Sequence, residues 1–132
     1  MARSREDLAA TIAKWSKRSR RARRNGDPDA MMAILEKVYR RARRYDVSAD
    51  HDFADFFGIS SGPSSEYDLI DALLRVTNGH DDRRLRSRYA SALKYALARK
   101  VRADDLRQFL ADHGGLSGGA KRWSRWRKKL GL

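Results

Sequence analysis

The fold of this chain is decided by residues 28–45, which read PDAMMAILEKVYRRARRY. Apolar side chains recur in this stretch every three to four residues, which is the period of an α-helix with one buried face. The same period continues in both directions along the chain, and no stretch has the period of two that a strand requires. The pattern therefore predicts an all-α protein. The buried stripe of this helix is predicted to be Met31, Ile34, Leu35, Val38, Ala42 and Tyr45.

Residues that begin or break helices divide the pattern into short segments. Asn25-Gly26 and Asn78-Gly79 are strong breaks, Gly58 suits the left-handed backbone that follows a helix, and Pro28 suits a first turn. We therefore expect a compact bundle of about six to seven short helices. The predicted helices are about Arg5–Arg24, Pro28–Tyr45, Ala49–Phe57, Glu66–Thr77, Asp81–Lys100, Ala103–His113 and Ala120–Leu130.

Length and composition favour a single folded domain. The chain has 132 residues, of which 41% are hydrophobic and 36% are charged. A folded chain of this length buries roughly two thirds of the surface that its unfolded form exposes, so it needs no metal or disulfide staple. Cysteine is absent, which excludes a disulfide scaffold, a thiolate zinc site and a cysteine nucleophile. We expect one compact domain with a basic helical hairpin at 1–45, a helical core at 46–113 whose segment 46–82 is acidic, a Gly-rich connector at 114–119 and a basic, Trp-containing helix at 120–132.

Charge is distributed unevenly along the chain. The formal net charge is +13, from 30 Lys and Arg against 17 Asp and Glu. Residues 1–45 carry a net charge of +9, residues 46–82 carry −8 and residues 83–132 carry +12. A strongly basic chain favours a polyanionic partner, most often nucleic acid. A phosphate backbone repels the acidic segment, which must therefore face elsewhere or pair with a basic surface.

A five-residue repeat, Arg-Arg-Ala-Arg-Arg, occurs at 20–24 and at 40–44 and closes a predicted helix each time. One or two cations satisfy the negative end of a helix dipole, and four exceed that need. In each copy the Ala lies on the apolar stripe and the arginines flank it toward solvent. We expect these arginines to contact phosphate groups, and a solvated helix face is the alternative. The residues are Arg20, Arg21, Arg23, Arg24, Arg40, Arg41, Arg43 and Arg44.

Two further groups of cations lie in the second half of the chain. Residues 83–88 place four arginines at the start of a predicted helix, where cations oppose the dipole unless a polyanion or an acidic patch compensates them. The tail 121–129 interleaves two indoles with cations. These indoles form a core stripe, stack on unpaired bases, or belong to a basic amphipathic helix on anionic lipid. The residues assigned to nucleic-acid binding here are Arg83, Arg84, Arg86, Arg88, Lys121, Arg122, Arg125, Trp126 and Lys128.

Residues 96–109 match the residue pattern of a helix-turn-helix, except that a lysine holds the turn position where glycine is common. In such a unit the second helix would present Arg102 and Arg107 to a groove of nucleic acid, although two neighbouring aspartates oppose the approach of phosphate. An ordinary helical hairpin is the alternative. The matching positions are Ala96, Lys100, Val101, Leu106 and Phe109.

Signals for catalysis are weak. His51 and His80 lie beside aspartates but lack further histidines at ligand spacing, and His113 is typical of a helix cap. We find no Walker-type phosphate loop and no nucleophile elbow. The chain also lacks the apolar run of a secretory signal or a membrane span. We expect a soluble, non-catalytic protein without a cofactor or a bound metal, located in the cytoplasm or on the nucleoid.

The sequence predicts a non-catalytic protein that grips the phosphate backbone of DNA or RNA through Arg- and Lys-rich helical faces. An alternative is a small helical subunit of a multi-subunit nucleoprotein assembly, such as an RNA-guided effector complex, whose acidic segment docks on a protein partner or on a neighbouring copy. A third is a membrane-surface or protein-inhibitor role of the Trp-bearing tail, and a membrane is the partner we expect least. The acidic residues assigned to a protein partner are Asp50, Asp52, Asp55, Asp68 and Asp71.

Overall fold

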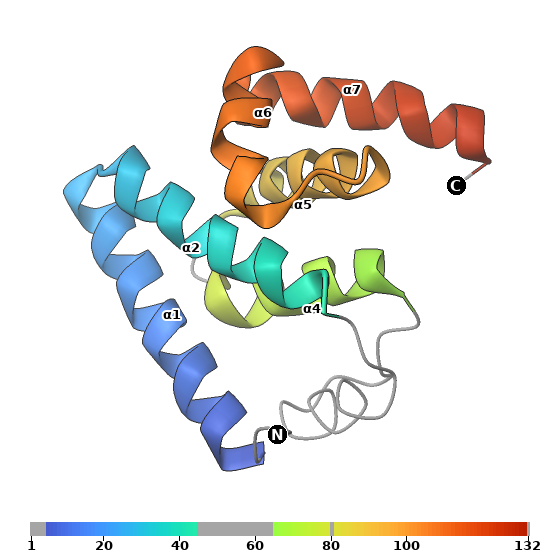
Figure 1. Ribbon diagram of the computed structural model, residues 1–132. Coiled ribbons are helices and arrows are strands. Elements are labelled where there is room, and N and C mark those ends of the chain that lie inside the picture. The colour runs from blue at the N-terminus through green and yellow to red at the C-terminus, as the bar shows by residue number, and fades with distance from the viewer. Residues whose placement is uncertain (1–4, 45–64, 80, 132) are drawn as a thin grey trace. The chain divides into compact units, whose positions relative to one another are not determined.

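A computed structural model describes residues 5–44, 65–79 and 81–131 of the chain (Figure 1). Every regular element within these residues is helical, so the predicted all-α fold is confirmed. The predicted helix Ala49–Phe57 lies outside the described residues. The elements are α1 (Arg5–Asn25), α2 (Pro28–Ala42), α4 (Glu66–Thr77), α5 (Arg83–Ala98), the 3-10 turn η1 (Ala103–Asp105), α6 (Leu106–Asp112) and α7 (Gly115–Leu130).

The chain divides into two compact units, Met1–His80 and Asp81–Leu132. In the first unit α1, α2 and α4 each pack against the other two. In the second unit α7 packs along α5, and α6 contacts both of these helices. Each unit buries apolar side chains of its own, which are Ile12, Ile34, Leu35, Val38, Tyr39, Leu69, Ile70 and Leu73 in the first and Leu93, Ala96, Leu106, Leu110 and Trp123 in the second, among others.

A tight turn folds α2 back along α1 (Figure 1). Gly26 holds a φ of +60°, and the hydrogen bonds around it are those of a Schellman motif. Asp27 then caps α2, because its Oδ1 accepts from the backbone N–H groups of Asp29 and Ala30, each at 3.1 Å. Pro28 occupies the first turn, where its missing N–H costs nothing. The break predicted at this point is therefore a compact link between two helices that pack together.

Asn78 marks a helix stop in the sequence, yet its side chain lies in the core of the first unit. It is the C-cap of α4 and is fully buried. Its Nδ2 donates to Ser19 Oγ of α1 at 2.8 Å and to Met31 Sδ of α2 at 3.4 Å. Its Oδ1 accepts from Thr77 Oγ1 at 2.8 Å. A buried amide that is satisfied in this way ties the end of α4 to both other helices.

Helix ends are where the structure and the prediction differ most. α2 ends at Ala42, three residues before the predicted end, and Arg43 is its C-cap. α5 begins at Arg83, because Asp82 acts as N-cap with its carboxylate accepting from the α5 backbone at 2.7 Å. The helix predicted over 103–113 is the turn η1 followed by α6. Capping contacts fix these ends, and an apolar period does not reveal them.

Residues 114–119, which the sequence predicts as a connector, are instead helical in five of six positions, because α7 begins at residue 115. A Cβ on Gly118 would collide with the carbonyl oxygen of His113. A Cβ on Gly119 would lie 3.2 Å from the Cβ of Ala92 on α5. These glycines therefore let α7 approach its neighbours closely rather than interrupt the helix.

The connection from α5 to α6 has the hydrogen bonds of a second Schellman motif. The N–H of Val101 donates to the carbonyl of Ala96 at 3.0 Å, and the N–H of Lys100 donates to the carbonyl of Leu97 at 3.0 Å. Lys100 holds a φ of +58°. Every other non-glycine residue within the described ranges has a negative φ. The residue at the turn position of the helix-turn-helix pattern thus has a left-handed backbone conformation, although it is a lysine rather than a glycine. Ala96 and Leu106 are fully buried, so α5 and α6 form a packed helical hairpin.

Candidate nucleic-acid interface

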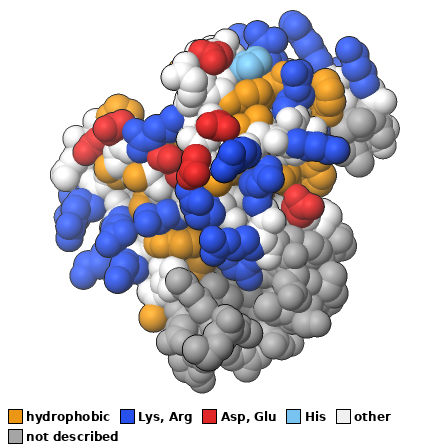
Figure 2. Space-filling model, viewed as in Figure 1, with side chains coloured by type: hydrophobic (Ala, Val, Ile, Leu, Met, Phe, Trp, Pro, Cys, Tyr) orange, Lys and Arg blue, Asp and Glu red, His pale blue; other side chains and the backbone are white. Residues whose placement is uncertain are grey.

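The outward face of α1 is crowded with cations. Residues 8–26 contain seven Lys and Arg and no Asp or Glu. These side chains are all exposed, whereas Ile12, Ser19 and Ala22 on the opposite face are buried. The seven are Lys14, Lys17, Arg18, Arg20, Arg21, Arg23 and Arg24. Figure 2 shows Lys and Arg side chains gathered over α1 at the left of the view, so this helix presents a positively charged surface.

The two arginine repeats place their side chains in nearly the same way. In the first repeat Ala22 is buried and all four arginines are exposed. In the second repeat Ala42 is buried, Arg41 is half-buried and the other three arginines are exposed. The predicted geometry, a buried Ala flanked by exposed arginines, holds for seven of the eight arginines, and Arg41 departs from it. The contact of these arginines with phosphate stays a prediction.

Two arginines of the second repeat make hydrogen bonds within the first unit. Arg41 Nη1 donates to a backbone carbonyl three residues further on, at 3.4 Å, and Arg43 hydrogen-bonds the side chain of Tyr39. Burial raises the pKa of Tyr39, while the hydrogen bond and the charge of Arg43 partly oppose that rise. Burial also raises the pKa of Tyr67, and the neighbouring Glu66 adds to the effect. Arg41 and Arg43 of the second repeat therefore make contacts within the first unit.

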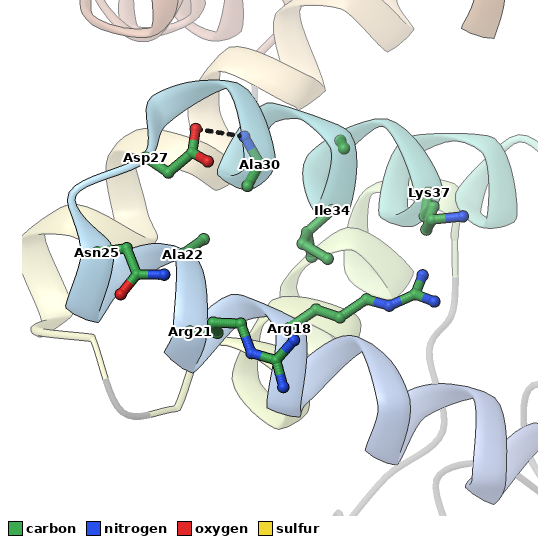
Figure 3. Close-up of a pocket in the computed structure, with 9 residues that line it drawn as sticks. Arg18, Arg21, Ala22, Asn25, Asp27, Ala30, Ile34 and Lys37 are labelled. Atoms are coloured by element: carbon green, nitrogen blue, oxygen red, sulfur yellow. Dashed lines mark hydrogen bonds between the residues drawn. The ribbon is translucent and has the colours of Figure 1, made fainter.

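An open groove of about 220 Å³ lies between α1 and α2 (Figure 3). Its floor includes the buried side chains of Ala22 and Ile34. Its rim carries the exposed cations Arg18 and Arg21 from α1 and Lys37 from α2. A cationic rim above an apolar floor suits a ligand that is anionic in one part and apolar in another.

Sequence reasoning missed two of these three cations. Arg21 belongs to the first repeat, but Arg18 and Lys37 stand outside both repeats. A signal was present, because Lys14, Arg18 and Arg21 recur at the four- and three-residue spacing of one helix face. That spacing does not reveal which other helix lies beside this face of α1. Only the three-dimensional structure shows that α2 packs there and that Lys37 lines the same groove.

The arginine strip at the start of α5 is less uniform than predicted. Arg83, Arg84 and Arg88 are exposed. Arg86 is half-buried, and its Nε is buried without a hydrogen-bond partner in the described part of the chain. The strip therefore offers three outward cations, while Arg86 belongs partly to the interior of the second unit.

The two tryptophans of α7 differ in their surroundings. Trp123 is 6% exposed and lies in the core of the second unit, as the core-stripe interpretation expects. Trp126 is half-buried, and its ring meets the ring of Tyr95 at an interplanar angle of 76° with the centroids 6.2 Å apart. The guanidinium of Arg99 lies 5.5 Å from the centroid of Trp126. A base that stacked on Trp126 would have to compete with Arg99. The outward cations of this helix include Lys121, Arg122, Arg125 and Lys128.

The second helix of the α5–α6 hairpin has little positive charge to offer. Arg102 and Arg107 are exposed, but Asp104 and Asp105 are exposed beside them. Residues 102–112 hold three acids and two arginines, a net charge of −1, and α6 itself is seven residues long. A helix that enters the major groove passes close to phosphates on both sides. The charge of this segment therefore opposes major-groove docking.

The structure describes two of the five acidic residues assigned to a protein partner. On α4, Asp68 is exposed and Asp71 is half-buried, and Ser65 caps the helix by accepting from the N–H of Asp68 at 3.2 Å. A docking role for these acids stays a prediction. The other three, Asp50, Asp52 and Asp55, lie outside the described residues.

Within residues 5–44, 65–79 and 81–131, no group of three or more His, Cys, Asp or Glu side chains is placed to hold a metal ion. None of the helices in these ranges has both the length and the apolar character that crossing a bilayer requires. No protein-family model, curated protein or solved structure matches the chain. The function must therefore be argued from the chemistry of the surface.

Proposed function

We propose that this chain is a non-catalytic nucleic-acid-binding protein that grips the phosphate backbone through its basic helical faces. The observation that carries the proposal is α1, which exposes seven cations over residues 8–26 without an acid among them. Like charges three or four residues apart on a helix repel, by roughly 0.2–0.5 kcal/mol per pair. A phosphate backbone removes that repulsion, and the counterions released from the nucleic acid favour the complex.

Recognition of the backbone, rather than of base edges in a duplex, is the form of binding that the charges support. A protein that reads base edges directly places a helix or a pair of strands in the major groove. The residues beside that element must not repel the phosphates that border the groove. Residues 102–112 are the candidate for that element, and they carry a net charge of −1. The cations lie instead on α1, on α5 and on α7. We therefore expect weak sequence preference in duplex DNA and strong dependence on salt.

Fluorescence anisotropy with labelled duplex DNA, single-stranded DNA and RNA of mixed sequence tests the proposal between about 50 and 200 mM salt. The logarithm of the binding constant should fall linearly with the logarithm of the salt concentration. The double variant Arg20→Gln plus Arg24→Gln should reduce this slope by about two, because two phosphate contacts are lost. Arg75→Gln, which removes an exposed cation of α4, should leave the slope unchanged.

Two results would overturn the proposal. One is the absence of binding to all three nucleic acids at about 50 mM salt. The other is an equal effect per charge removed in the α1 double variant and in Arg75→Gln, because net charge rather than the face of α1 would then determine affinity. Circular dichroism of each variant confirms that the helices are intact before affinities are compared.

A further inference from the structure

The groove between α1 and α2 has two chemically different ends (Figure 3). Arg18 extends its guanidinium from α1 toward the end at which Lys37 of α2 lies, so this end is cationic. The amide of Asn25 and the carboxylate of Asp27 lie at the other end, beside the turn that joins the helices. A ligand that matches the groove is anionic at one end and offers hydrogen-bonding groups at the other.

Small apolar side chains separate the two ends. Ala30 and Ala33 of α2 are half-buried and line the groove, and the buried Ile34 and Ala22 complete the floor. The two half-buried alanines leave space that a longer side chain would fill. A sugar or the face of a planar ring is the kind of group that gains from contact with such a floor.

We infer that this groove binds one unpaired nucleotide of a single-stranded nucleic acid, with the phosphate between Arg18 and Lys37 and the base at the Asn25–Asp27 end. The inference rests on the proposed function and names the ligand of one part of that surface. A nucleotide combines an anionic group, apolar sugar and ring faces, and a hydrogen-bonding edge. A base inside a duplex is paired and stacked and cannot enter, so the groove distinguishes single strands from duplexes.

Asp27 determines which base fits best. An ionised carboxylate accepts hydrogen bonds and donates none. Cytosine presents an amino donor at the position where uracil presents a carbonyl acceptor. The groove therefore prefers cytosine to uracil. Asp27→Asn retains a side chain that caps helices as well as aspartate does, and it adds an amide donor that suits uracil, so this variant should lose the preference without losing α2.

Two leucine variants separate the groove from the rest of the basic surface. Ala33→Leu fills the groove without changing a charge, and leucine is a strong helix former, so α2 should keep its structure. Ala111→Leu is the matched control, because Ala111 is exposed on α6, belongs to a segment without net positive charge and does not line the groove.

The experiment measures the affinity of the full chain and of its variants for oligocytidine, oligouridine and a mixed-sequence RNA duplex at one salt concentration. The unmodified chain should bind oligocytidine about fivefold or more tightly than oligouridine, and Asp27→Asn should bring the two affinities within about twofold of each other. Ala33→Leu should weaken oligocytidine binding about tenfold and leave duplex binding within about twofold, whereas Ala111→Leu should leave both within about twofold.

The outcomes separate this inference from the function on which it rests. If Ala33→Leu weakens single-strand and duplex binding alike, or weakens neither, the groove assignment is wrong while backbone binding stands. If the unmodified chain binds none of the three ligands at about 50 mM salt, both are wrong. Should Ala33→Leu lower the helical content, Lys37→Gln is the second variant, because Lys37 is exposed. It should weaken oligocytidine binding more than duplex binding, and an equal effect on both would refute the groove assignment.

Discussion

Lys100 adopts a backbone conformation that glycine adopts at far lower cost. Its φ is +58° at the C′ position of the Schellman motif that closes α5, whereas Gly26 holds the same position after α1 with a φ of +60°. A left-handed conformation costs a residue with a Cβ roughly 1–2 kcal/mol. The two motifs are therefore a matched pair in which the second one is strained.

We predict that Lys100→Gly raises the free energy of unfolding of the second unit by about 1 kcal/mol, because relief of the left-handed strain exceeds the added entropy of the unfolded chain. The reciprocal variant Gly26→Ala should lower stability by about 1 kcal/mol, since its Cβ would meet nothing within 4 Å and the cost is that of the backbone alone. Urea denaturation followed by circular dichroism measures both changes. A loss of stability in Lys100→Gly would contradict the assigned strain.

Asn78 is a second residue whose role exceeds what its type suggests. We predict that Asn78→Ala destabilises the first unit by about 2 kcal/mol, because Ser19 Oγ would lose its buried amide donor, whereas Thr77 Oγ1 would keep the carbonyl of Leu73 as its acceptor. Asn25→Ala removes an exposed amide and should change stability by less than about 0.5 kcal/mol. Equal effects of the two variants in thermal unfolding would show that the buried network contributes nothing.

At the scale of elements, α7 is the helix whose formation depends most on packing. Two of its glycines lie where a side chain would meet a neighbouring helix or the preceding turn. Glycine weakens an isolated helix by about 1 kcal/mol per residue relative to alanine. The contacts of α7 with α5 and α6 offset that weakness, so the helix begins at Gly115 rather than after the glycines.

We predict that Gly118→Ala destabilises the second unit by about 2 kcal/mol, although alanine favours helices in general, because its Cβ would collide with the carbonyl oxygen of His113. Ser117→Ala, at an exposed position of the same helix, should be neutral or slightly stabilising. Chemical denaturation of both variants is the measurement. If Gly118→Ala were as stable as Ser117→Ala, the close approach of α7 to the preceding turn would be wrong.

Elements with a strong apolar period and side-chain caps were predictable. The bounds predicted for α4, Glu66–Thr77, agree with the structure, because Ser65 caps its start and Asn78 its end. α7 was predicted five residues too short, since glycine pairs are typical of loops and the sequence does not show which backbone they must approach. The helical spacing of the first arginine repeat was enough to predict that its side chains are exposed. The groove could not be predicted from the sequence, because it exists only where α1 and α2 pack together.

At the scale of the whole molecule, each unit carries a basic helix that contains no acid over most or all of its length. In the first unit this is α1 over residues 8–25, and in the second it is α7, with six Lys and Arg and no Asp or Glu. The net charge of residues 1–80 is +3 and that of residues 81–132 is +10. Each unit therefore presents a positively charged helix.

We predict that the two units contribute additively to the salt dependence of binding. Neutralising Lys121, Arg122, Arg125 and Lys128 with Gln should reduce the slope of log affinity against log salt by up to about four. Combining these changes with Arg20→Gln and Arg24→Gln should sum the two effects, because each neutralised cation removes its own phosphate contact. Anisotropy titrations measure the slopes. A slope unaffected by the α7 changes would restrict binding to the first unit.

If α1 binds a polyanion as proposed, its acid-free face would also make the lifetime of the protein in the cell depend on how much of it is bound. Crowded cations strain the folded state of the first unit when nothing is bound, and any ligand that binds the folded state alone raises its stability. In a cell, transiently unfolded chains are degraded. Copies in excess of the available polyanion would be removed faster than bound copies. The abundance of the protein would then follow the abundance of its ligand without a dedicated regulator.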